Sequence, residues 1–273
     1  MRPLRLMAVL AHPDDESLGF GGTLAKYASE GVDVSLLTAT RGDAGRYRGH
    51  PPDHEAHPGA RALAAIREGE LRAAAAVLGV RELVVLDYHD QQLDSAAPRD
   101  VIDGIARHIR RIRPDVVLTF GSDGAYGHPD HIAISQFATA AIVAAAAHAD
   151  ESDPGDPPHV VSKLYYLAWP ASAWVAYEAA FRRLTSTVDG NTRQATPWPE
   201  WALTTVIDTR AFWPTVWQAI SCHASQVAAY ERLRDVAPEH HEALWGWQSF
   251  YRVFSTVNGG RVRETDLFEG IQR

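Results

Sequence analysis

Residues 5–16 read RLMAVLAHPDDE, an apolar run that ends abruptly in a polar cluster. A continuous apolar run of this length is typical of a strand that is buried on both faces of a parallel sheet. The cluster opens with His12-Pro13-Asp14, and a proline suits the first position of a helix. The stretch therefore predicts a central strand whose carboxyl end presents polar side chains at the start of a helix.

The chain around this stretch alternates predicted strands with predicted helices. We expect further strands at 32–40, 83–86 and 116–120, and helices at 17–30, at 60–78, between Pro98 and Pro114, and from about 130 to 147. The helix between the two prolines has the clearest pattern, because its apolar residues repeat at helical spacing. This alternation implies βαβ units and predicts an α/β fold, a Rossmann-like and mostly parallel sheet flanked by helices.

The last third of the chain has a less regular pattern. An acidic, Pro-rich stretch near 150–158 separates a predicted catalytic core, 1–149, from a C-terminal part, 150–273. Strands are expected there at 163–169 and 204–207, and its tryptophans are expected mainly in the core. We predict that this part completes the sheet and the substrate pocket within one structural unit.

A polar stretch rich in Gly and Pro over residues 42–59 predicts a long loop, whose size suggests a lid. It contains His50, His54 and His57. Because no strand or helix fixes these three side chains, they are interpreted as surface histidines and not as a second metal site.

Composition excludes several classes of function. The net charge of −8 gives no general attraction to nucleic acid or to an anionic membrane. The apolar N-terminal run is far shorter than the roughly 18 residues of a membrane span. With Cys222 as the only cysteine, no intrachain disulfide can form, so a cytoplasmic location is the simplest expectation. A small-molecule substrate is expected, and self-association stays open.

The first polar cluster can supply metal ligands. His12 and Asp15, three residues apart, can point the same way and offer one nitrogen and one oxygen, as Zn²⁺ accepts. Asp14 is then left free beside the metal, where a water-activating base is required. Alternatively, the acidic residues only stabilise the N-terminus of a helix, and this cluster alone does not separate the two interpretations.

A second cluster, GAYGHPDH at 124–131, follows another predicted strand and again opens a helix. In a sheet of order 3-2-1-4 the first and fourth strands are neighbours, and ligands bind where their carboxyl ends meet. The two clusters should therefore face each other. His131 would complete a His, Asp, His set with an open position for water. His128 lies beside it as a candidate cation or general acid that Asp130 would orient.

The paired clusters resemble those of the LmbE-like, or PIG-L, metal-dependent N-deacetylases over roughly the first half of the chain. The resemblance implies Zn²⁺ bound by His12, Asp15 and His131, and Asp14 as the general base. Fe²⁺ is the alternative metal. It also implies removal of an N-acetyl group from a glucosamine-containing small molecule, which gives acetate and a free amine.

The same resemblance implies roles for further residues. Tyr126, two residues before His128, occupies the position of a tyrosine that helps bind the developing oxyanion in one subgroup of the family. Substrate contacts are expected from five polar residues: Arg67, Asp90, Asp43, His223 and Gln226. Residues 41–46 read RGDAGR where that subgroup often has acidic residues, so the resemblance does not specify the same substrate.

The charge on His128 depends on two opposing effects. A helix N-terminus disfavours an imidazolium, whereas Asp130, Asp14 and Asp15 favour it. If the carboxylates prevail, His128 is protonated and can donate a proton to the departing amine.

Three other functions stay open. An amidase acting on thiol–sugar conjugates would use the same scaffold. A nucleotide-binding Rossmann protein would need a third glycine that the stretch GFGG at 19–22 lacks, and close packing of helix on sheet explains those glycines as well. A non-catalytic sugar-binding module would be expected to have lost Asp14 or a metal ligand.

Overall fold

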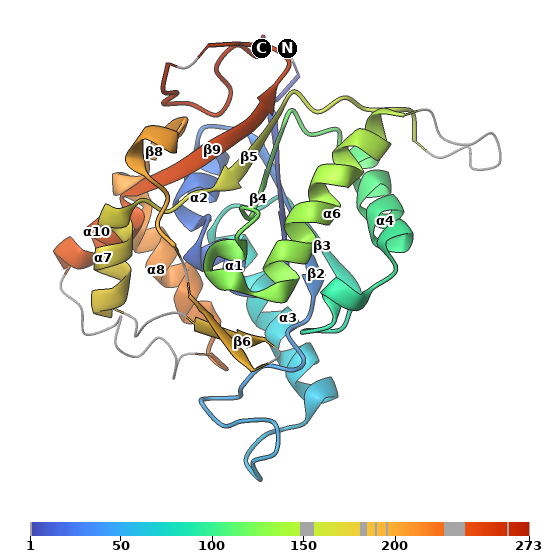
Figure 1. Ribbon diagram of the computed structural model, residues 1–273, viewed down its shortest axis with the longest axis vertical. Helices are drawn as coiled ribbons and strands as arrows, with labels where there is room; N and C mark the ends of the chain where they lie inside the picture. Colours follow the sequence, from blue (N-terminus) through green and yellow to red (C-terminus); the bar gives the residue numbers. More distant parts are fainter. Residues whose placement is uncertain are drawn as a thin grey trace.

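The computed structural model describes residues 2–147, 156–180, 185–188, 190–194, 196–226, 238–260 and 262–272. Within them one sheet of seven strands has the order β3-β2-β1-β4-β5-β9-β8 (Figure 1). Its strands are β1 (Arg5–Leu10), β2 (Asp33–Thr40), β3 (Glu82–Tyr88), β4 (Val116–Thr119), β5 (Lys163–Leu167), β8 (Thr205–Asp208) and β9 (Trp247–Ser255). A separate hairpin pairs β6 (Thr185–Val188) with β7 (Asn191–Gln194).

The sheet confirms the expected Rossmann-like fold. Parallel pairs join β1 to β2 and β4, β2 to β3, and β4 to β5. The expected 3-2-1-4 order is therefore present. Strand β9 is antiparallel to β5 and to β8, so strands from the C-terminal part extend the same sheet.

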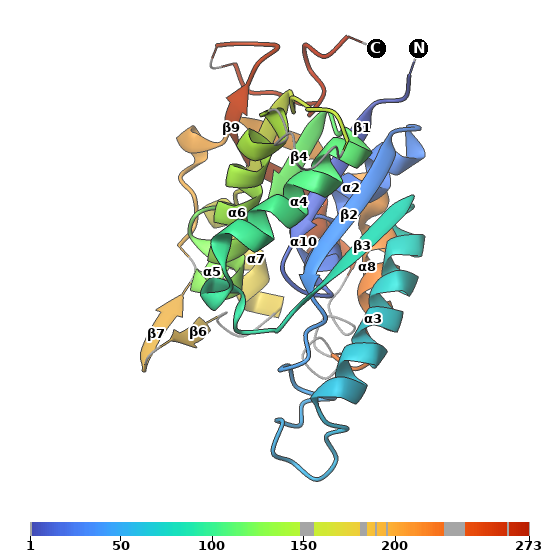
Figure 2. The ribbon, with the colours of Figure 1, turned by 90° about the vertical axis from the view of Figure 1, so that its right-hand side faces the viewer.

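Helices cover both faces of the sheet (Figures 1 and 2). On one face, α4 (Pro98–Ile112) packs against α6 (Pro129–Ala146). On the other face, α8 (Trp213–Cys222) packs against α2 (Gly21–Ser29) and α3 (Ala60–Val77). The remaining helices are short: α1 (Asp15–Leu18), α5 (Gly124–Gly127), α7 (Ala171–Ala180) and α10 (Pro238–Trp245), with single 3₁₀ turns at Leu93–Ser95, Glu200–Ala202 and Arg210–Phe212. Among the described residues, none of the helices combines the length and apolar character that crossing a bilayer requires.

Two features differ from the sequence-based expectation. The helix predicted over 17–30 is broken into α1 and α2, because Phe20 turns inward, fully buried, and packs edge-on against Phe120. Gly22 lets this segment approach its neighbours, since a Cβ there would lie 2.8 Å from Thr209 Cβ. The close-packing interpretation of the glycines is thus the one the structure supports. Strand β9 and the β6–β7 hairpin were not predicted.

A buried ionic cluster connects the C-terminal strands to one another. Glu264, 1% exposed, accepts hydrogen bonds from Lys163 Nζ at 2.8 Å, Tyr165 Oη at 2.7 Å and Arg252 Nη1 at 2.6 Å. Burial raises the pKa of the Glu264 carboxyl, but the hydrogen bonds from Asn258, Lys163 and other donors outweigh it and lower this pKa to about 2. The cluster therefore stabilises the fold as long as Glu264 is ionised.

Replacing Glu264 by glutamine is expected to lower the free energy of unfolding by about 3 kcal/mol at pH 7, because the buried Lys163 and the partly buried Arg252 lose their counter-charge. The pKa of Glu264 is lower in the folded chain than its ordinary 4.5. Its stabilisation is therefore present above that value and is lost as pH falls toward about 2. Denaturant unfolding at several pH values measures this. Glu30→Gln, at an exposed pair with Lys26, serves as control and should cost less than about 1 kcal/mol. A deficit in Glu264→Gln that is independent of pH would contradict the account.

Candidate active site

The two polar turns lie side by side because β1 and β4 are paired in register, Leu6 with Val116 through Ala8 with Leu118. The turn after β1 carries His12, and the turn that leads into α6 carries His131. The two rings meet with His12 Nδ1 3.1 Å from His131 Nε2. The expected juxtaposition of the two clusters is therefore observed.

Asp15 joins these two imidazoles. Its Oδ1 lies 3.2 Å from His131 Nε2, and its Oδ2 lies 3.6 Å from His12 Nδ1. Backbone N–H groups of Ala11 and His12 donate to the same Oδ2, so the carboxylate is fixed. Burial raises the pKa of Asp15, but the neighbouring His131 and His12 outweigh it and hold this pKa well below its usual range. Two imidazole nitrogens and one ionised carboxylate thus converge on a buried point.

Two triplets of described residues bring one ligand atom from each member within 4.8 Å of one another, His12 with His128 and His131, and His12 with Asp90 and Asp130, and Asp15 belongs to neither. The second triplet uses the opposite nitrogen of His12, since Nε2 lies 3.1 Å from Asp90 Oδ1 and 3.0 Å from Asp130 Oδ2. These carboxylates therefore orient the ring and turn Nδ1 toward His131. Burial disfavours the imidazolium, but hydrogen bonds to the two carboxylates raise the pKa of His12 well above its ordinary value.

The set of His12 Nδ1, His131 Nε2 and Asp15 fits a divalent cation best. It has the two imidazole nitrogens and one oxygen that open zinc sites use, with His12 giving up its proton when the metal binds, and carboxylates outside the set support one of its histidines. Assignment of these ligands stays a prediction, as does the identity of the metal.

Asp130 differs from the expectation that it orients His128. Its fully buried carboxylate accepts from the backbone N–H of Gln91 at 2.7 Å and of Leu93 at 3.1 Å, besides contacting His12. Only its backbone N–H reaches His128, by donating to Nδ1 at 3.2 Å. The first turn of α6 directs the carboxylate toward the loop after β3, so Asp130 supports His12 instead.

His128 caps α6 and is held in one tautomer. Because Nδ1 accepts the N–H of Asp130, the hydrogen of a neutral ring resides on Nε2. Burial, followed by repulsion from His12 and His131, lowers the pKa of His128 to about 3. His128 would be a cation only if the nearby carboxylates outweighed these effects. In this structure they do not. His128 offers a neutral N–H donor.

Asp14 Oδ2 is 3.3 Å from Arg67 Nη2, and its exclusion from the ligand set stays a prediction. Arg67 was expected to contact substrate. Instead its buried guanidinium is bound to the site itself, donating to the carbonyl oxygens of Pro13 at 2.5 Å and Gly42 at 3.0 Å. Gly42 has a φ of 65°, and a side chain there would collide with this guanidinium. Arg67 thus supports Asp14 from behind, and a substrate contact by Arg67 stays a prediction.

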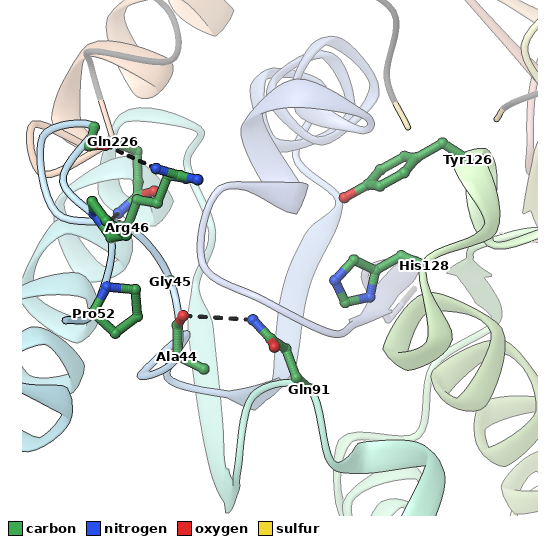
Figure 3. Close-up of a pocket in the computed structure, with 10 residues that line it drawn as sticks. Ala44, Gly45, Arg46, Pro52, Gln91, Tyr126, His128 and Gln226 are labelled. Atoms are coloured by element: carbon green, nitrogen blue, oxygen red, sulfur yellow. Dashed lines mark hydrogen bonds between the residues drawn. The ribbon is translucent and has the colours of Figure 1, made fainter. Parts of the chain in front are cut away.

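Tyr126 and His128 point into one cavity of about 670 Å³ (Figure 3). The turn that carries Tyr126 is irregular, with φ values of 60° at Gly124, 63° at Ala125 and 78° at Gly127. Burial and then the charges of Asp15 and Asp14 raise the pKa of Tyr126 well above its usual range. Its hydroxyl therefore stays protonated and can donate a hydrogen bond.

The loop 42–59 forms the opposite wall of this cavity through Ala44, Gly45 and Arg46 (Figure 3). Gln226, which also lines the cavity, donates to the Arg46 carbonyl oxygen at 2.8 Å. Asp43 accepts the backbone N–H of Asp90 at 3.0 Å and so helps to place that carboxylate. Substrate contacts by Gln226, Asp43 and Asp90 stay predictions, as does a lid role for the loop.

The histidines of this loop do not assemble into a metal-binding triplet among the residues that the structure describes. His50 and His54 stack with ring centroids 4.2 Å apart, and His57 Nε2 lies 3.1 Å from the Gly45 carbonyl oxygen.

The position of the His223 side chain also differs from the expectation. It was expected to contact substrate, but it is fully buried and its Nε2 lies 2.7 Å from Glu16 Oε1. A buried carboxylate requires such a partner, which explains why the side chain turns away from the cavity. Burial lowers the pKa of His223, but the charge of Glu16 outweighs it and raises this pKa.

Sequence reasoning missed Tyr177. It lies in α7, stacks on Trp174 with ring centroids 5.6 Å apart, and packs at a tilt against Trp169 with centroids 4.7 Å apart. Burial and then the charges of Asp14 and Asp15 raise the pKa of the Tyr177 hydroxyl, as burial and the same two charges do for Tyr126. No sequence pattern could have indicated this, because α7 follows the first turn by some 160 residues and enters the site only through the fold.

Comparison with known proteins identifies relatives. Residues 7–142 match the family described as GlcNAc-PI de-N-acetylase, PIG-L. A 1D-myo-inositol 2-acetamido-2-deoxy-alpha-D-glucopyranoside deacetylase from Rhodococcus opacus is 37% identical, over 99% of this chain and 99% of that protein. This similarity extends well beyond the two polar clusters and includes the C-terminal part.

Solved structures share the fold at lower identity. The N,N'-diacetylchitobiose deacetylase from Pyrococcus horikoshii matches with a TM-score of 0.66 and 22% identity, over 91% of this chain and 83% of that one. GalB, a 4-carboxy-2-hydroxymuconate hydratase from Pseudomonas putida, matches with a TM-score of 0.68 and 19% identity, over 95% and 99%. Because these two proteins carry out different reactions, the fold alone does not specify the reaction.

Proposed function

The chain belongs to the PIG-L family and is a deacetylase of glucosamine-containing small molecules, and we propose that its substrate is an N-acetylglucosamine linked to inositol. The observation that supports this substrate is the 37% identity over nearly all of both chains to a deacetylase of that compound. The cavity of about 670 Å³ beside Tyr126 and His128 has room for a sugar with its attached group.

We propose that zinc is the metal, held by His12, Asp15 and His131, with Fe²⁺ as the alternative. Nitrogen and carboxylate ligands in an open three-residue site suit zinc. When bound, the ion would supply a Lewis acid that acidifies water and polarises the acetamide carbonyl. The remaining chemistry is assigned to the chain's own side chains.

Asp14 is the proposed base. Its carboxylate is not among the ligands, and it takes the proton from the water that attacks the acetamide carbon. Tyr126 donates its O–H to the carbonyl oxygen as negative charge develops there. The C–N bond then breaks, and the departing nitrogen needs a proton. Asp14 holds the one taken from water, while His128 Nε2–H faces the cavity as a hydrogen-bond donor to the leaving group.

His128→Ala is expected to keep its metal and to lower kcat on the order of 10²-fold, because a donor to the reacting groups is lost. Since burial and the neighbouring histidines lower the pKa of His128 to about 3, its titration should contribute no limb to the profile of kcat between about pH 5 and 9. Steady-state kinetics across pH and elemental analysis check this. Loss of the metal would make His128 a ligand, and a limb that disappears in the variant would restore its role as a cation.

The proposed substrate is tested by comparing N-acetylglucosamine, its inositol glycoside, N,N'-diacetylchitobiose and a thiol–sugar conjugate with a longer acyl group. Released acetate and newly formed primary amine are both quantified. We expect the highest kcat/KM for the inositol glycoside. Cleavage of the longer acyl group without acetate release would favour the amidase alternative instead. The cytoplasmic location and any self-association remain predictions.

A further inference from the structure

The backbone of Asp14 adopts a conformation that an L-residue rarely holds. Its φ is 102° and its ψ is −23°, in the left-handed region. This conformation costs free energy for a residue with a Cβ, so surrounding contacts must maintain it. The conformation of Asp14 also affects where its carboxylate points relative to that of Asp15. The Asp15 carboxylate turns back and accepts the N–H groups of Ala11 and His12. Adjacent carboxylates are thereby sent to different places.

Glu16 makes a hydrogen bond to the backbone at this position. The Asp14 backbone N–H donates to Glu16 Oε2 at 2.9 Å. Glu16 is fully buried and lies in the first turn of α1. This short helix alone does not fix the position of the Glu16 side chain. A hydrogen bond from a backbone amide to an ionised carboxylate is among the stronger kinds, provided that the carboxylate is itself held in place.

His223 holds that carboxylate from the far side. Its Nε2 lies 2.7 Å from Glu16 Oε1, which also accepts the Ser17 hydroxyl at 2.6 Å. Both His223 and Glu16 are fully buried, so solvent does not weaken the pair. Because an ionised carboxylate has no hydrogen to give, His223 Nε2 is the donor.

His223 is in turn anchored by the residues that follow it. Ser225 donates its N–H and its hydroxyl to the two carboxylate oxygens of Glu70 in α3, each at 2.6 Å. The Ser225 carbonyl oxygen accepts the N–H of Arg48 at 2.6 Å, from the loop that walls the cavity. The end of α8 is therefore tied both to a long helix and to the cavity wall.

We propose that His223 and Glu16 form a clamp that holds Asp14 in its left-handed conformation and so aims the proposed base. His223 is a positioning residue, since it acts on Asp14 through Glu16 and does not line the cavity. The clamp depends on the proposed function in one respect only, namely that Asp14 is the catalytic base. The C-terminal part of the chain thus contributes to catalysis through a contact that spans 207 positions of sequence.

A matched pair of variants tests the clamp. In His223→Gln the amide nitrogen lies as many bonds from Cβ as Nε2 does and can still donate to Glu16. In His223→Asn the amide is one bond shorter and mimics Nδ1 instead. We expect His223→Asn to lower kcat by roughly 10- to 100-fold, the usual effect of a misplaced catalytic group, with KM and metal content unchanged. His223→Gln should stay within about threefold of the native kcat. Equal kcat in the two variants would overturn the proposal.

A double-mutant cycle separates positioning from general destabilisation. When the base is already removed by Asp14→Asn, its position no longer matters, so adding His223→Asn should lower kcat by less than about twofold further. An undiminished loss in that background would show that His223 acts by another route. His159→Gln is the control for loss of a buried imidazole. His159 is bonded to the Pro114 carbonyl oxygen at the opposite end of the sheet, and the variant should retain native kcat.

A measurement without catalysis completes the test. Amide hydrogen exchange of the segment 11–18 in metal-free protein should be faster in His223→Asn than in the native chain, His223→Gln or His159→Gln, because the Asp14 N–H loses its fixed acceptor. Unchanged exchange in His223→Asn would overturn the clamp. If exchange changes as expected but no chain, native included, releases acetate from any N-acetylglucosamine conjugate, the proposed function fails and the clamp stands.

Discussion

Asp14→Asn is expected to lower kcat by a factor on the order of 10² to 10⁴ while leaving the fold and the metal content unchanged. The Asp14 carboxylate lies 3.3 Å from Arg67 and is not one of the proposed ligands, so its replacement removes a proton acceptor and no ligand. Asparagine keeps the size of the side chain and can still accept a hydrogen bond from Arg67. Steady-state kinetics, thermal unfolding and elemental analysis on the same preparation measure the three quantities.

Asp15→Asn is the matched comparison, since the same change is made one residue away. Asp15 presents Oδ1 to His131 and Oδ2 to His12, and Oδ2 also accepts two backbone N–H groups. We expect this variant to bind metal weakly and to lose activity for that reason. If both variants kept their metal and lost the same share of kcat, the division of roles between the adjacent carboxylates would be wrong.

His131→Ala is expected to lower the metal content from about one ion per chain to about a tenth or less after dialysis, and acetate release should fall with it. His131 Nε2 faces both His12 Nδ1 and Asp15 Oδ1, so its loss leaves two ligands, too few for tight binding. The ring also stacks on Phe120 with centroids 3.9 Å apart, so thermal unfolding must be compared as well.

Two controls accompany that variant. His131→Phe keeps an aromatic ring against Phe120 but has no nitrogen, so it separates loss of the ligand from loss of packing on Phe120. His128→Ala, the neighbouring histidine of the same cluster, should retain its metal. Full metal content in both His131 variants would remove His131 from the site.

The core of the fold could be predicted because its signals are local. The apolar run of β1, the prolines that bound α4 and the strand–helix alternation each depend on a short stretch of chain. The order of the first four strands then followed from the handedness and geometry of βαβ units. The juxtaposition of His12 with His131 depended only on that order, so the sequence alone was enough to bring together two residues that lie 119 positions apart.

The supporting contacts could not be predicted, because they depend on side-chain direction and on distant packing. Asp130 adjoins His131 in sequence, but the turn at Pro129 directs its carboxylate to His12 and the loop after β3. The break at Phe20 arises because the core beneath it accepts an aromatic ring, which no propensity of the segment itself reveals.

The C-terminal part illustrates the same limit on a larger scale. His223 was assigned to the cavity by resemblance, whereas it lies behind the turn that carries Asp14 and contacts Glu16. Tyr177 had no motif around it at all. Tyr177 lies in α7, directly after β5, and His223 follows α8, between β8 and β9. Strand β9 pairs antiparallel with β5 and has no regular apolar alternation that would have marked it as a strand.

The most direct test of the account is acetate release from an inositol glycoside of N-acetylglucosamine, measured before and after metal removal by a chelator and again during titration with Zn²⁺. The account predicts that the metal-free chain retains its fold, releases no acetate, and recovers activity that saturates at about one Zn²⁺ per chain. Metal-free protein that still releases acetate at the native rate would contradict it. So would a fully metal-loaded chain that releases acetate from none of the N-acetylglucosamine conjugates.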